Sequence, residues 1–61
     1  MSLALIVTIF GLVNTLLTIV KDAPGAADAI KTLLAEVEPF IDQGHPLAPM
    51  FADLKAKAAA L

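Results

Sequence analysis

The sequence predicts an all-α chain in which one N-terminal transmembrane helix precedes two short amphipathic helices, without an independent globular core. Three observations support this prediction. Residues 1–20 contain no charged side chain, two later segments carry apolar residues at helical spacing, and turns rich in proline and glycine separate the segments.

The chain is small for a fold that must stabilise itself. It has 61 residues, and a chain of about that length buries only about 60% of its unfolded surface. It contains no cysteine, which excludes disulfides and thiolate metal sites. Its hydrophobic content is 59%, above the roughly 45–50% of ordinary soluble domains. We therefore expect it to depend on a lipid bilayer or on other protein subunits, as a homo- or hetero-oligomer.

Residues 1–21 are predicted to form the transmembrane helix. The uncharged run over residues 2–20 is about 28 Å long at about 1.5 Å per residue, close to the roughly 30 Å of bilayer hydrocarbon. A secretory signal peptide is the competing interpretation, but the run has no basic segment before it. All four lysines follow the run, which weakly favours a single-pass topology with the N-terminus outside and the C-terminus inside.

A turn at residues 22–25 is expected to end this helix. The next helix is predicted over residues 26–41, because apolar side chains recur there every three or four positions. Pro39 should end or kink it, since proline lacks the N–H and clashes with the preceding turn. The predicted apolar contact face consists of Ile30, Leu34, Val37 and Ile41.

A second turn is expected at residues 42–46, and a third helix over residues 47–61. Two prolines fall near its first turn, where proline is tolerated. Its apolar side chains again recur at helical spacing. The predicted contact face of this helix consists of Leu47, Phe51, Leu54, Ala58 and Leu61.

Small and weakly polar residues form a seam along the first helix. In an apolar environment such residues let helix backbones approach closely, and Thr or Asn side chains hydrogen-bond across the contact. The seam therefore predicts a helix-packing surface, although a chance scatter of small residues is the plainer alternative. Asn14 flanks the seam, and we expect it to bond to a neighbouring helix rather than to line a pore. The seam residues are Ala4, Thr8, Gly11, Thr15 and Thr18.

Composition and motifs argue against catalysis and against several kinds of ligand. The net charge of −2 and the lack of arginine do not suit nucleic acid, which requires clustered cations. No phosphate-binding loop, nucleophile motif or metal-ligand spacing is present, so no enzyme activity, cofactor, metal or small-molecule substrate is expected. His45 could act as a pH switch but is expected to be a solvated loop residue. The six carboxylates are expected to be solvated.

Three functions remain in competition. The first is a small, non-catalytic structural or accessory subunit of a membrane-associated assembly, either a membrane enzyme complex or a virion membrane, docked through its N-terminal helix. The second is a self-assembling, membrane-permeabilising protein of the holin or peptide-pore kind. The third is a helical structural component buried inside a large soluble particle, which the absence of Trp and Tyr for a membrane-interface belt keeps open.

Overall fold

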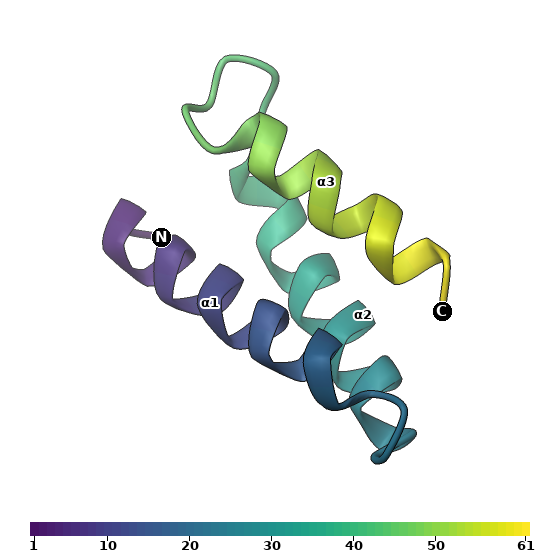
Figure 1. The fold of residues 1–61 in the computed structure, drawn as a ribbon. Helices are drawn as coiled ribbons and strands as arrows, with labels where there is room; N and C mark the ends of the chain where they lie inside the picture. Colours follow the sequence, from purple (N-terminus) through teal and green to yellow (C-terminus); the bar gives the residue numbers. More distant parts are fainter.

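Three α-helices and one short 3₁₀-helix make up the chain, which a computed structural model describes over residues 1–61 (Figure 1). α1 covers Leu3–Ile19, α2 covers Gly25–Val37, η1 covers Glu38–Phe40 and α3 covers Ala48–Ala59. No strand is present, so the predicted all-α class with three helices is confirmed.

Local hydrogen bonds explain where the helices begin and end. The Ser2 hydroxyl accepts a bond from the Leu5 N–H at 3.1 Å and caps α1. At the far end of α2, Pro39 falls within η1, where its ring and missing N–H prevent the α-helical ladder from continuing. The chain then turns through residues 41–47 and enters α3. Pro49 lies in the first turn of this helix, where proline is tolerated.

The three α-helices pack on one another in an up-down-up arrangement, with each pair in contact (Figure 1). The radius of gyration is 11.1 Å. A compact chain of this length is expected to have about 10.5 Å, and an unfolded one about 24 Å. The helices therefore form a closed bundle and do not extend away from one another.

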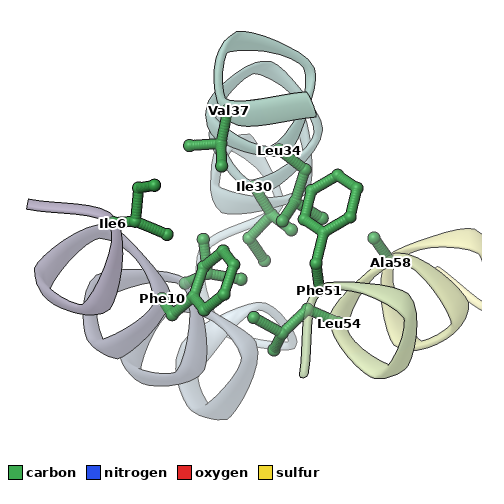
Figure 2. Packing of buried hydrophobic residues seen from close by; sticks show 9 residues of the cluster. Ile6, Phe10, Ile30, Leu34, Val37, Phe51, Leu54 and Ala58 are labelled. Atoms are coloured by element: carbon green, nitrogen blue, oxygen red, sulfur yellow. The ribbon is translucent and has the colours of Figure 1, made fainter. Parts of the chain in front are cut away.

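The core of this bundle is a single cluster of apolar side chains from all three α-helices (Figure 2). Phe10 of α1 and Phe51 of α3 stack across it, with ring centroids 6.1 Å apart and planes inclined by 21°. No polar or charged side chain is buried. The cluster comprises Ile6, Phe10, Val13, Ile30, Leu34, Val37, Phe51, Leu54 and Ala58.

The core corrects one prediction. The sequence was expected to yield no independent globular core, and this is wrong, because the apolar faces of the second and third helices meet α1. The prediction placed the first helix in the membrane and treated the second and third helices alone as too short to form a core. In the bundle, one side of α1 supplies the cover itself.

None of the helices combines the length and hydropathy required to cross a bilayer. The transmembrane helix predicted over residues 1–21 is therefore not supported. α1 contains 17 residues, and part of its apolar surface is used in the core of the bundle.

Candidate docking surface

α1 has two different sides. Its inner side is formed by Ile6, Phe10 and Val13, each at most 1% exposed. At about 100° per residue, the seam predicted from the sequence points about 150° away from these three side chains. All members of that seam, Ala4, Thr8, Gly11, Thr15 and Thr18, are exposed. The seam thus faces away from α2 and α3.

Other exposed side chains border the seam on both sides. Leu5, Leu12 and Ile19 follow one edge at intervals of seven residues, and they are 48%, 49% and 43% exposed. Val7, which is also about half exposed, and Asn14 follow the other edge at the same interval. We call the seam together with these two edges the outer surface of α1. It combines small and weakly polar residues with exposed apolar ones.

The threonine hydroxyls of the outer surface are already satisfied within the helix. The Thr8 hydroxyl donates to the Ala4 carbonyl at 2.9 Å, and the Thr15 hydroxyl donates to the Gly11 carbonyl at 3.1 Å. The Thr18 hydroxyl donates to the Thr15 carbonyl at 2.6 Å. An apolar partner can therefore cover these hydroxyls without leaving a buried donor unpaired, which would otherwise cost about 1–3 kcal/mol per group.

Gly11 lies at the middle of the seam and has no packing role inside the bundle. A Cβ atom placed on it would meet nothing within 4 Å apart from its own local backbone. Glycine inside a helix costs roughly 0.5–1 kcal/mol relative to alanine. Nothing in the bundle packs against this position, so the fold itself does not require glycine there.

The outer surface carries no charge, and α1 takes part in no ion pair. All charged side chains lie between Lys21 and Lys57. The structure has two ion pairs, Lys55 with Glu38 at 3.5 Å and Lys57 with Asp53 at 3.1 Å. All four side chains are at least half exposed. The Lys55 ammonium also lies 5.7 Å from the centre of the Phe51 ring. Charge is thus concentrated on the α2, η1 and α3 part of the molecule.

Most of the predicted amphipathic contact residues lie inside the bundle. Ile30, Leu34, Val37, Phe51 and Leu54 are buried in the core. Ile41 and Leu47 are half buried and pack against its edge. Leu61 is 48% exposed and lies outside the cluster. These faces are therefore largely covered by other helices of the same chain.

Sequence reasoning did not identify the inner side of α1. Ile6, Phe10, Val13 and Leu17 are spaced four, three and four residues apart, the interval that also marked the faces of the later helices. That spacing was the available signal. It was obscured because the opposite side of α1 is also uncharged, which made the segment look apolar in every direction.

The remaining polar residues do not form a second site. Asn14 is exposed and takes part in none of the side-chain hydrogen bonds. The His45 Nδ1 atom accepts the Leu47 N–H at 3.0 Å and so orders the approach to α3. The structure contains no pocket and no group of His, Asp and Glu side chains close enough to share a metal ion.

The outer surface of α1 is therefore exposed, uncharged and not used in the core of the fold. No protein-family model, curated protein or solved structure matches this chain.

Proposed function

We propose that this chain is a small, non-catalytic accessory subunit that docks onto a larger, membrane-associated assembly through the outer surface of α1. One observation carries the proposal. The bundle holds itself together with one side of α1 while the opposite side exposes large apolar residues and no charge. Exposed apolar surface that the fold does not use is typical of interaction sites.

The structure of the outer surface favours a helix as the docked element. Small residues along its middle allow a second backbone to approach closely, and the ridges at Leu5, Leu12 and Ile19 would flank that backbone. The internally bonded threonine hydroxyls lower the cost of excluding water. The membrane setting is supported by the uncharged stretch over residues 1–20, because an uncharged surface can lie beside lipid without a desolvated charge. Docking does not require α1 to span the bilayer.

A second candidate function is a helical component of a large soluble assembly. The specific observation in its favour is the closed core, which gives the chain a folded form without lipid. Both candidates use the same docking surface. They differ in whether the docked complex is held in a membrane.

Site-specific photocrosslinking in cells that naturally make the chain tests the proposal. A photoreactive phenylalanine analogue replaces Leu12 on the outer surface of α1 or, as the matched control, Met50 on α3. The two native side chains are 49% and 48% exposed, so the comparison holds accessibility nearly constant.

We expect discrete crosslinked products from position 12 and none from position 50. The position 12 products should sediment with membranes and resist an alkaline carbonate wash. The same products in the soluble fraction would favour the second candidate. Equal labelling from both positions, or none from position 12, would contradict docking through this surface.

A further inference from the structure

The start of α3 is held by a side-chain acceptor that a proton can remove. We propose that protonation of His45 opens this start and loosens the contact between α3 and α1, so that the bundle responds to mild acid. The proposed switch lies in the turn at residues 41–47 and is independent of docking through α1.

His45 supplies the acceptors for two successive N–H groups at the start of α3. Its Nδ1 atom accepts the Leu47 N–H and its carbonyl accepts the Ala48 N–H, each at 3.0 Å. The Leu47 side chain, at the N-cap position, makes no capping bond. The imidazole is therefore the one side chain that accepts a backbone N–H where the turn meets α3.

Only a neutral imidazole can form the bond to Leu47. When Nδ1 is the acceptor, the ring proton is on Nε2, whereas an imidazolium carries a proton on both nitrogens. Protonation therefore sets an N–H at Nδ1 against the Leu47 N–H, two donors whose nitrogens are 3.0 Å apart, and the bond is lost. Histidine is the side chain that ordinarily gains its proton between about pH 8 and pH 5, so mild acid is sufficient.

No carboxylate is in place to compensate for the lost bond. No carboxylate oxygen lies within 4.0 Å of an imidazole nitrogen. Glu38 is paired with Lys55, and the Asp42 Oδ1 atom accepts the Gly44 N–H at 3.1 Å. The partial positive charge at the N-terminus of α3 also disfavours a cation there. The charged groups of the turn and of the elements around it are Glu36 of α2, Glu38 of η1, Asp42 of the turn, Asp53, Lys55 and Lys57 of α3 and the Met1 ammonium before α1.

Leu47 and Phe51 connect the turn to the core. Leu47 is half buried and packs against the core cluster. Its carbonyl accepts the Phe51 N–H at 2.9 Å. The Phe51 ring is 6% exposed and stacks on Phe10 of α1 (Figure 2). A displacement of Leu47 therefore reaches the contact between α1 and α3 within one helical turn.

Linkage gives the direction of the effect. The unfolded chain can bind the proton without losing a hydrogen bond, whereas the folded chain must give up the bond to Leu47. The unfolding free energy should therefore fall as the pH falls through the range in which histidine gains its proton, and recover as the pH rises.

Nitrogen NMR, amide hydrogen exchange and urea unfolding of the full chain, between about pH 7.5 and about pH 5, test the switch. His45→Asn is the matched variant, because an asparagine side chain can accept a backbone N–H two residues on but has no proton to gain. Asp42→Asn is the control that removes the titrating carboxylate of the same turn. Exchange is compared as protection factors, which correct for the intrinsic pH dependence of exchange.

We expect Nδ1 to carry no proton at the higher pH. On protonation, the protection factor of the Leu47 amide should fall about tenfold, the equivalent of one typical hydrogen bond. The urea midpoint of the native chain should fall over the same pH range. His45→Asn should show neither fall, and Asp42→Asn should show both.

Three results would overturn the switch. They are a proton on Nδ1 at the higher pH, a Leu47 protection factor that does not change with pH, and the same pH dependence in His45→Asn as in the native chain. Loss of the pH dependence in Asp42→Asn would assign the effect to that carboxylate and also exclude His45. None of these results bears on photocrosslinking from position 12, so the switch and the docking can fail separately.

Discussion

Phe10 is the side chain that most directly couples α1 to the rest of the molecule. It is 1% exposed, and its ring stacks on Phe51 from α3 (Figure 2). Two residues along the chain, Leu12 is of similar hydrophobicity but is 49% exposed. The two positions therefore separate a side chain that holds the fold from one available for docking.

Replacement of Phe10 by Ala is expected to cost about 3–5 kcal/mol of unfolding free energy, because it leaves a cavity between α1 and α3. A domain of this size has only about 3–9 kcal/mol in total, so much of the population should unfold. Urea unfolding followed by circular dichroism measures the loss. Leu12→Ala is the control and should change stability by about 0.5 kcal/mol or less. Equal losses at the two positions would contradict the assignment of the inner side of α1.

The sequence did not distinguish these two kinds of apolar residue. The interval from Ile6 through Phe10 to Val13 defines a helix side, but the same interval arises whether that side faces lipid or another helix. On the later helices, charged residues marked the outward side and so revealed the inward one. α1 has no charged residue to provide this contrast.

At the scale of the elements, short-range hydrogen bonds determine where helices begin. The Ser2 hydroxyl caps α1, whose first turn contains no acidic side chain that could reinforce the cap. The His45 imidazole has a comparable role before α3, where the Leu47 side chain offers no capping group. In each case one side-chain acceptor lies just before a helix of fewer than twenty residues.

Removal of the Ser2 cap should destabilise the bundle measurably. Ser2→Ala is expected to lower the unfolding free energy by about 1 kcal/mol, because the Leu5 N–H loses its acceptor. Ser2→Asp supplies another acceptor and a charge that suits the helix N-terminus, so it should retain the native stability. A urea midpoint for Ser2→Ala that equals that of Ser2→Asp would show that the cap contributes nothing.

The His45 acceptor is tested in the same way. His45→Ala should cost about 1 kcal/mol, since the half-buried Leu47 N–H is left without its partner. His45→Asn keeps a side-chain acceptor near the backbone and should recover much of the loss. Hydrogen exchange at the Leu47 amide reports the local effect. Unchanged protection of this amide in His45→Ala would show that the imidazole does not stabilise it.

The helices themselves could be anticipated because their signals are local. Proline at position 39 predicted an interruption near the end of the second helix, and the structure has η1 there, from Glu38 to Phe40. Helical spacing and turn residues act over a few positions and need no knowledge of the tertiary fold. How the helices meet is a long-range property that these local patterns do not contain.

At the scale of the whole molecule, the bundle depends on contributions from all three helices. The nine-residue core includes residues from α1, α2 and α3. The expectation that no independent core would form failed because it counted the second and third helices as a pair and placed the first one in lipid. Hydrophobicity drives burial but does not specify whether lipid or protein covers the surface.

Removal of α1 should therefore abolish cooperative folding. A peptide covering residues 22–61 lacks Ile6, Phe10 and Val13, which exposes the apolar faces of α2 and α3. Two short helices that lose this cover are expected to be marginal in water. Thermal melting by circular dichroism should be broad for the peptide and sigmoidal for the full chain. A sigmoidal transition in the peptide would contradict a single three-helix core.

The division of α1 into a folding side and a docking side is the central claim, and one substitution tests it most directly. Leu12→Lys is compared with the native chain by thermal unfolding of the purified chain and by association with a larger assembly, measured by co-fractionation from cells that naturally make the chain. We expect an almost unchanged thermal midpoint, because position 12 is half exposed, together with loss of association, because the lysine charge would lie against the docked helix. A large fall in the midpoint would place Leu12 in the core, and unchanged association would show that docking does not use the outer surface of α1.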